Sequence, residues 1–129
     1  MDFRKAFAPV CNKKTLFFKK ANGLRDDLHC IFCLSVPRQR ALIKCLNDTI
    51  PNWQNLKIHE SSPSGATYKF LKKMPNYIPT QFFENINFGS NFNGFRCEDL
   101  SKQTFKDKFF DIVITQDVME HILDPLNAL

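Results

Sequence analysis

From residue 56 onward, short apolar runs alternate with polar loops. Residues 56–60 predict a buried strand and residues 61–65 a loop, and residues 66–73 predict a helix with Phe70 and Leu71 on its inner face. Residues 77–81 predict a second strand. This order of elements is a βαβ unit, which has parallel strands and binds ligands at their carboxyl ends.

Two later segments predict further strands. Residues 95–100 indicate a short strand that ends in two acidic residues. Residues 109–116 are β-branched and apolar on both faces, as expected of a central parallel strand. A helix should follow over residues 117–122, with Asp117 as its N-cap.

The region before residue 56 predicts one helix. Ser35 can serve as its N-cap, Pro37 fits its first turn, and the helix should end before Pro51. Leu42, Cys45 and Leu46 repeat at helical spacing and predict its inner face. Arg38 and Arg40 lie nearer the polar side, where they would hold a substrate anion or be surface charges. Cys45 and Cys97 are interpreted as ordinary buried small residues.

The length and composition set limits on the kind of protein. The chain has 129 residues, enough for one domain or for one small module and part of another. No apolar run approaches the roughly 20 residues of a membrane span, and the N-terminus lacks the apolar core of a signal peptide. We therefore expect a cytoplasmic protein that has no membrane partner.

Charge is unevenly distributed along the chain. Residues 1–44 hold ten Lys/Arg and three Asp/Glu, whereas residues 45–129 hold eight and ten. This split indicates two pieces with different roles. The basic first piece either contacts an anion such as nucleic acid or presents a solvated lysine-rich surface.

The cysteines indicate an incomplete metal site. Cys30 and Cys33 form a CxxC pair, and Cys11 precedes them. A zinc ribbon needs two such pairs, because four thiolates surround one zinc ion. Ala8 stands where the first pair needs its other cysteine, and His29 is an awkwardly placed alternative ligand. We interpret residues 1–36 as a degenerate zinc-ribbon-like segment, with Cys11, Cys30 and Cys33 as candidate zinc ligands.

Several motifs together resemble class I S-adenosylmethionine-dependent methyltransferases, in particular bacterial members of the type 11 group. The resemblance covers about three quarters of the chain. The matching positions are Cys30, Cys33, Ser35, Pro37, Arg38, Arg40, residues 59–63, Thr80, Gln81, residues 98–100, Phe110, Asp111 and residues 116–121. It implies that residues 37–129 are the N-terminal half of a Rossmann-like domain, a truncated fragment with parallel strands in the order 3-2-1-4 and an apolar edge strand.

The resemblance also implies site residues at the strand ends. Glu60 would contact the methionine end of S-adenosylmethionine, and the loop with Ser61, Ser62 and Gly65 would wrap that end. Gln81 would meet the ribose, where most members carry an acid. Asp99 and the Leu100 N–H would bind adenine, and Gln116 and Asp117 would close the pocket. Glu60, Gln81, Asp99 and Gln116 should then meet in one cleft.

The sequence motifs say less about the catalytic residues and the substrate than about the cofactor. Glu120 and His121 lie near the substrate in this family, and His121 is the best general-base candidate. Asp99 and Asp117 are also good helix N-caps, His121 also suits a plain helix position, and His59 is interpreted as a hydrogen-bonded core histidine. We expect a small molecule or a glycan as methyl acceptor, which the sequence does not identify, and nucleic acid stays open as a partner. The rival hypothesis is a non-catalytic module whose basic head binds nucleic acid or a protein partner.

Overall fold

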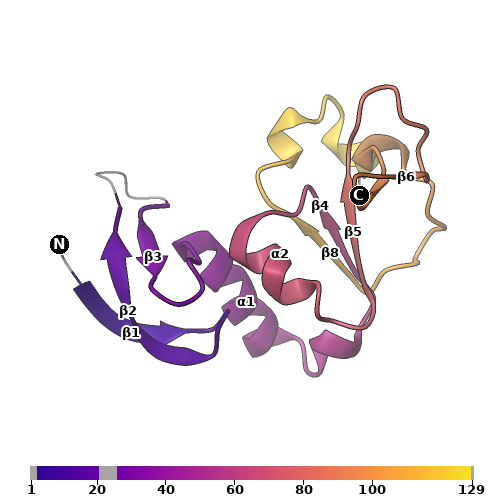
Figure 1. The fold of residues 1–129 in the computed structure, drawn as a ribbon. Helices are drawn as coiled ribbons and strands as arrows, with labels where there is room; N and C mark the ends of the chain where they lie inside the picture. Colours follow the sequence, from indigo (N-terminus) through magenta and orange to yellow (C-terminus); the bar gives the residue numbers. More distant parts are fainter. Residues whose placement is uncertain (1–2, 21–25, 129) are drawn as a thin grey trace. The chain divides into compact units, whose positions relative to one another are not determined.

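The computed structural model describes residues 3–20 and 26–128, and these form two compact units (Figure 1). The first unit comprises the chain up to Trp53 together with Ser64–Lys73. The second comprises Gln54–Pro63 and the chain from Met74 onward. None of the described helices is long and apolar enough to cross a membrane.

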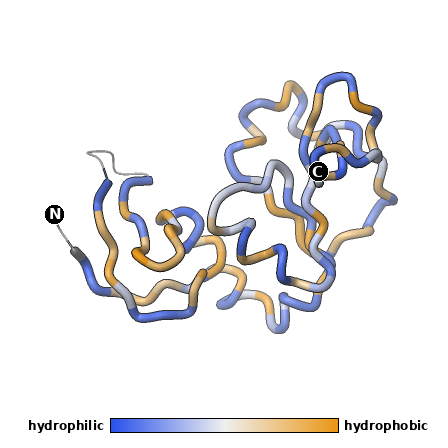
Figure 2. Tube along the Cα trace, in the orientation of Figure 1, coloured by the Kyte–Doolittle hydropathy of each residue, from blue (hydrophilic) through white to orange (hydrophobic). Residues whose placement is uncertain are grey.

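The first unit contains a three-stranded antiparallel sheet in the order β1-β2-β3. Its strands are β1 (Phe3–Ala8), β2 (Lys13–Lys19) and β3 (Leu28–Cys30). Ala8, Phe17 and Cys30 are buried together on one face. The Arg40 guanidinium lies over the Phe17 ring, 4.4 Å from its centroid. Hydrophobic and hydrophilic stretches both occur along this part of the chain (Figure 2).

Helix α1 (Pro37–Thr49) also belongs to the first unit. Its start at Pro37 and its end before Pro51 confirm the prediction, because proline fits the first turn and cannot continue a helix. The predicted cap is wrong: Val36 is the N-cap residue, and Ser35 is buried just before it.

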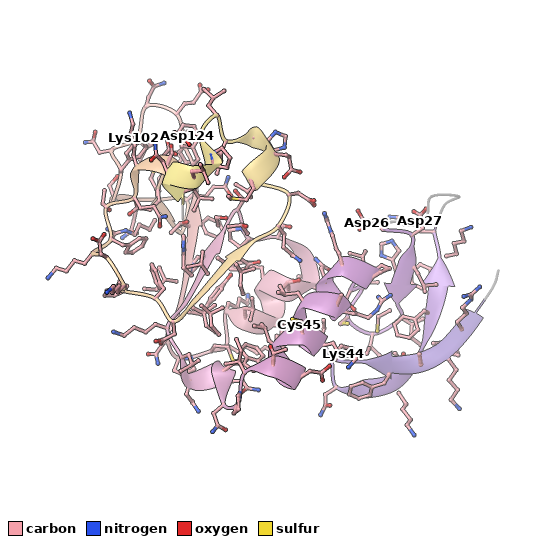
Figure 3. The ribbon with its side chains drawn as sticks, turned by 180° about the vertical axis from the view of Figure 1, so that it is seen from behind. Asp26, Asp27, Lys44, Cys45, Lys102 and Asp124 are labelled. Carbon is pink, nitrogen blue, oxygen red and sulfur yellow. The ribbon has the colours of Figure 1, made fainter. Side chains whose placement is uncertain are left out.

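The predicted inner face of α1 is right for Leu46 and wrong for the other positions. The buried positions are Gln39, Ile43 and Leu46, while Leu42 is half-buried and Cys45 is exposed. Figure 3 labels Cys45 on this helix. Both sets of positions have helical spacing, so periodicity alone could not choose between them. Cys97, in contrast, is buried as predicted.

Two short helical elements complete this region. The 3-10 helix η1 (Trp53–Asn55) contributes Trp53, whose ring lies 6.2 Å from that of Phe70. Phe70 is in α2 (Gly65–Leu71), which buries Ala66, Thr67 and Leu71. Gly65 has φ +63°, and a Cβ there would lie 2.6 Å from Gln39 Nε2. Glycine therefore suits the left-handed backbone at the start of α2, where the end of the Gln39 side chain also lies close.

The second unit contains a mixed five-stranded sheet in the order β6-β7-β5-β4-β8. The strands are β4 (Ile58–Ser61), β5 (Tyr77–Gln81), β6 (Asn91–Phe92), β7 (Phe95–Cys97) and β8 (Ile112–Thr115). Neighbours along β7-β5-β4-β8 are parallel, and only β6 pairs antiparallel, with β7. The architecture is therefore mixed α/β.

Strand β6 was not predicted, although the sequence carries a signal for it. Asn93 and Gly94 form the turn between β6 and β7, with φ of 49° and 82°. An Asn-Gly pair with two positive φ angles is the usual two-residue hairpin turn. This turn adds an antiparallel strand beside β7.

The predictions for the last strand and helix need correction. In β8, Ile112 and Ile114 are buried but Val113 is 55% exposed, so the strand is apolar on both faces yet buried on only one. Among the described strands it pairs only with β4. The segment after it forms the 3-10 helix η3 (Met119–His121), with Val118 rather than Asp117 as N-cap. The 3-10 helices η2 (Leu100–Lys102) and η4 (Pro125–Ala128) complete the unit.

His59 is a core histidine, as predicted. Its side chain is fully buried, and Nε2 lies 2.8 Å from Thr80 Oγ1 on the neighbouring strand. The ring stacks on Phe110 with centroids 4.9 Å apart. Burial lowers the pKa of His59 to about 4, although Glu98 acts in the opposite direction. The imidazole is therefore neutral in the folded protein at neutral pH.

Candidate functional sites

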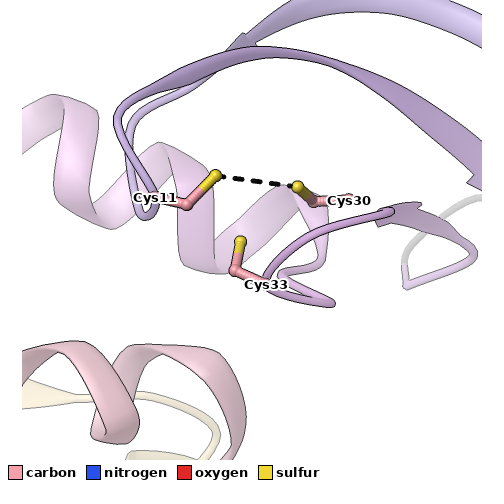
Figure 4. Close-up of side chains that lie close together, drawn as sticks. All are labelled: Cys11, Cys30 and Cys33. Carbon is pink, nitrogen blue, oxygen red and sulfur yellow. Dashed lines mark hydrogen bonds between the residues drawn. The ribbon is translucent and has the colours of Figure 1, made fainter.

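Three cysteine side chains of the first unit point toward one another (Figure 4). The sulfur atoms of Cys11, Cys30 and Cys33 all lie within 4.8 Å of one another, and those of Cys11 and Cys30 are 3.8 Å apart. Zinc–sulfur bonds of about 2.3 Å in a tetrahedron place two sulfurs about 3.8 Å apart. This group can therefore hold a metal ion with little movement of its thiols.

The first turn, residues 8–11, carries Cys11, and the second turn, residues 30–33, carries Cys30 and Cys33. The two turns have a common geometry. Cys11 is followed by Asn12 with φ 54°, and Cys33 is followed by Leu34 with φ 58°. Each turn thus places a residue in the left-handed region directly after its last cysteine. Ala8 occupies in the first turn the position that Cys30 occupies in the second, and it is fully buried.

The thiols differ in their electrostatic surroundings. Burial, followed by the neighbouring Cys33 and Cys30 thiols, raises the pKa of Cys11 to about 12. Burial also acts to raise the pKa of Cys30, but the backbone N–H groups of Cys33 and Phe32 and the other two thiols outweigh it and lower that pKa. Cys30 is therefore the readier thiolate in the metal-free protein.

A cation and a hydroxyl group support the cluster. Burial lowers the pKa of Arg40, and the nearby Cys30 and Cys33 act to raise it. Its guanidinium donates to the carbonyls of Ser35 and Leu28, which fixes its position. The Cys33 thiol donates to Ser35 Oγ at 3.1 Å. Three thiolates around a divalent cation leave one negative charge, which Arg40 can offset.

His29 does not join the described cluster. It lies on β3 next to Cys30, so its side chain points to the opposite face of the sheet, where it stacks on Phe18 with centroids 5.5 Å apart. A fourth ligand from the first turn is absent because residue 8 is alanine. The cluster within the described residues therefore offers three thiol ligands.

The second unit contains a cavity of about 570 Å³ at the carboxyl ends of its parallel strands. The lining includes Ser61 at the end of β4 and Ser62 after it, Thr80 in β5, Asp99 after β7 and Asp117 after β8. This volume lies within the range of small-molecule sites.

Asp99 both caps a helix and faces the cavity. Its Oδ1 accepts hydrogen bonds from the backbone N–H of Ser101 at 2.9 Å and from the Ser101 hydroxyl at 2.6 Å. Its Oδ2 makes no such bond to any described residue, so it remains open to a ligand. Leu100 begins η2 and also lines the cavity. The first N–H groups of a helix have no intrahelical acceptor, which leaves the Leu100 N–H available as well.

The neighbouring carboxylate of Glu98 is fully engaged. Its oxygens accept from the Thr104 backbone N–H at 2.9 Å, from the Thr104 hydroxyl and from Arg96 Nε at 2.7 Å. Burial acts to raise the pKa of Glu98, but the bonds to Thr104 and Arg96 outweigh it, so the pKa is lowered. Glu98 therefore stabilises the turn that presents Asp99.

Ser61 supplies an open polar atom at the cavity. It is 5% exposed, and its Oγ is buried without a hydrogen-bond partner among the described residues. Ser62 adopts φ 51°, and its N–H donates to Thr80 O at 2.8 Å. Buried hydroxyls are normally paired, so Ser61 Oγ is suited to bind a ligand.

The four side chains expected in one cleft do not all meet there, since only Asp99 lines the cavity. Gln81 and Gln116 are half-buried outside the lining. Glu60 is 2% exposed, and its carboxylate accepts from the Tyr77 hydroxyl. Burial raises the pKa of Glu60, and the bond from Tyr77 acts against this. The observed hydrogen-bond partner of Glu60 is therefore Tyr77 on the neighbouring strand β5.

The remaining predicted residues are divided between the cavity and other positions. Asp117 and His121 line the cavity, and both are exposed. Glu120 is exposed outside the lining, and Gly65 belongs to the first unit, against Gln39.

Sequence reasoning missed several cavity residues. Lys102 and Asp124, labelled in Figure 3, line it together with Phe82 and Asn127. Lys102 belongs to η2, and Asp124 directly precedes η4, which contacts η2. No local sequence pattern predicts that these two segments meet.

Comparison of the chain with family models, with curated proteins and with solved structures gives no match. The assignment of a function therefore depends on the sequence motifs and on the geometry of the two sites.

Proposed function

We propose that the second unit binds S-adenosylmethionine and that the protein is a methyltransferase of the class I type. The observation that carries the proposal is the cavity at the ends of β4, β5, β7 and β8, lined by Ser61, Ser62, Asp99, Leu100 and Asp117. These five belong to the cofactor positions that the motifs imply. The parallel neighbours β7-β5-β4-β8 within the mixed sheet are compatible with the order 3-2-1-4 that the resemblance implies, which supports the proposal.

The open polar atoms suit a nucleoside. Asp99 Oδ2 can accept from the adenine amino group, while the Leu100 N–H can donate to a ring nitrogen. Ser61 Oγ can bond a hydroxyl or an ammonium group of the ligand. The proposal gives Glu60 no contact with the cofactor, because its carboxylate is buried beside Tyr77.

S-adenosylmethionine would supply a methyl group bound to a sulfonium, from which the neutral thioether leaves readily, so that the protein would contribute mainly position and proton transfer. His121 lines the same cavity and is the candidate base that takes a proton from the acceptor. Lys102 and Asp124 add one charge of each sign to the lining. A polar small molecule fits these groups as acceptor.

Calorimetry with S-adenosylhomocysteine tests the proposal. Asp99→Asn retains an oxygen that can accept from Ser101, so η2 stays capped, but it presents an amide N–H₂ where the adenine amino group needs an acceptor. We expect this variant to bind at least about tenfold more weakly, the scale of one charge-assisted hydrogen bond.

The matched control is Asp107→Asn, which changes an exposed aspartate outside the cavity lining and should leave binding unchanged. Absence of heat with the parent chain, at ligand concentrations well above the expected dissociation constant, would contradict the proposal. Equal losses in both variants would contradict the role of Asp99.

We also propose that Cys11, Cys30 and Cys33 bind zinc through three thiolates, with the fourth position open to solvent or to an external ligand. The three converging sulfur atoms support this, and so does Arg40 as a nearby counter-charge. Such a site would stabilise the first unit, since a metal that binds only the folded state adds to its stability.

A further inference from the structure

One face of the three-stranded sheet of the first unit carries buried residues, whereas no described side chain on the opposite face is buried. Residues directly opposite each other in antiparallel strands project to the same side. Phe17 and Cys30 are such a pair, and both are buried. Pairs on the other face include Phe7 with Lys14, Lys5 with Leu16, and Phe18 with His29.

Aromatic and apolar groups are accessible on this second face. Phe7 is 52% exposed and Leu16 is 39% exposed. Phe18 and His29 are half-buried, and their rings stack on each other. The Phe7 pair and the Phe18 pair are four residues apart along β2, which is about 13 Å at 3.3 Å per residue. The face therefore presents two separated flat groups.

The two longer strands of the sheet, β1 and β2, carry basic residues and no acidic ones. Lys5 and Lys14 lie on this second face and are exposed. Residues 3–20 hold six Lys or Arg and no Asp or Glu. A polyanion is the complementary partner, and the aromatic groups require that it also offer planar apolar surfaces. Single-stranded nucleic acid provides phosphates and unpaired bases together.

We propose that this sheet face binds single-stranded nucleic acid, with Lys5 and Lys14 beside phosphates and with bases stacked on Phe7 and on the Phe18–His29 pair. The proposal uses residues of the first unit only, so it stands or falls separately from the cofactor cavity. It does not depend on metal at the cysteine cluster, because the ligand cysteine on β3 projects to the opposite face.

The test is fluorescence anisotropy of the full chain with a labelled 12-nucleotide oligothymidine and with a duplex of equal length. We expect the single strand to bind more tightly than the duplex. Phe7→Leu retains apolar bulk but removes the stacking surface, and should weaken binding about tenfold. Phe7→Tyr retains an aromatic ring and should bind like the parent chain. Phe92→Leu changes a phenylalanine of the second unit that is 43% exposed, and should have no effect.

Salt dependence tests the role of the lysines. For single strands, the slope of log affinity against log salt changes by about 0.7 for each phosphate contact. Lys5→Ala and Lys14→Ala should each reduce the slope by about that amount, whereas Lys106→Ala in the second unit should leave it unchanged.

Three results would overturn the proposal: no binding of the oligonucleotide, equal binding by Phe7→Leu and the parent chain, or equal affinity for heparin, which has charge but no bases. Binding to phosphatidylserine vesicles in place of the oligonucleotide would assign the face to a membrane surface and would also overturn it. Circular dichroism establishes that each variant is folded.

Discussion

Leu34 adopts a backbone conformation that its side chain disfavours. Its φ of 58° lies in the left-handed region, and its side chain is 57% exposed. The left-handed region costs a residue with a Cβ roughly 1–2 kcal/mol, and this side chain buries little surface in return. The turn of Cys30 and Cys33 holds the residue there through the Leu34 N–H, which donates to Cys30 O at 3.0 Å.

We expect Leu34→Gly to stabilise the first unit by about 0.5–1 kcal/mol. Glycine removes the clash at positive φ, and the greater entropy of the unfolded chain offsets part of that gain. Urea unfolding of the two proteins measures the difference. Asn12→Gly is the matched control and should change stability by less, since asparagine tolerates this region. A loss of stability in Leu34→Gly would show that the leucine side chain packs in the folded protein.

At the scale of one element, the inner face of α1 is defined by Ile43 rather than by Cys45. Ile43 is fully buried, and Cys45 is exposed two residues further along. We expect Ile43→Ala to cost about 2–4 kcal/mol through lost burial and the cavity that remains. Cys45→Ala should change stability by less than about 0.5 kcal/mol. Thermal unfolding of both variants checks this, and comparable losses would contradict the observed face.

The contact between β4 and β5 through His59 predicts a pH dependence. The folded-state pKa of about 4 lies below the ordinary 6.5, so the folded protein favours the neutral ring. The stability that His59 contributes is therefore fully present above about pH 6.5 and is lost as the pH falls toward 4. Linkage gives a loss of about 3 kcal/mol over this range.

Comparison with His59→Gln isolates this contribution, because glutamine does not titrate and can still bond Thr80 Oγ1. The stability of the parent chain minus that of the variant should fall between pH 6.5 and 4. A difference that stays constant over this range would mean that His59 titrates alike in the folded and unfolded chain.

At the scale of the whole molecule, metal binding should act on one unit and not on the other. The three sulfur atoms belong to the first unit, so added zinc should raise the stability of that unit alone. Hydrogen exchange during zinc titration locates the effect. Cys30→Ser should abolish it, whereas Cys45→Ser, which changes an exposed cysteine outside the cluster, should not.

Ala8→Cys should increase zinc affinity by at least about tenfold, because it adds a fourth thiolate beside Cys11 and Cys30. Competition with a chromophoric chelator measures the affinity. Full four-ligand affinity in the parent chain would instead show that another group completes the site.

The predictions from the sequence that the structure confirms rest on local patterns. Strand β5 spans residues 77–81 as predicted, and α1 starts at Pro37, because side-chain alternation and a missing backbone N–H act within a few residues. The CxxC pair gave two of the clustered cysteines directly, and the first turn, which carries Cys11, supplied the third. The Asn93–Gly94 turn was equally local, and its hairpin was predictable.

Tertiary structure decided which partner each side chain meets. Glu60 follows the motif but lies against Tyr77, seventeen residues along the chain, once β4 and β5 pair. Gly65 lies in a loop by sequence, yet in the fold it begins α2 at φ +63°, where any residue with a Cβ is strained, and the end of the Gln39 side chain lies against it. The inner face of α1 is likewise decided by the packing that buries Ile43. Helical and strand periodicity specify only that a face exists, whereas burial depends on segments distant in sequence, and those come together only when the chain folds.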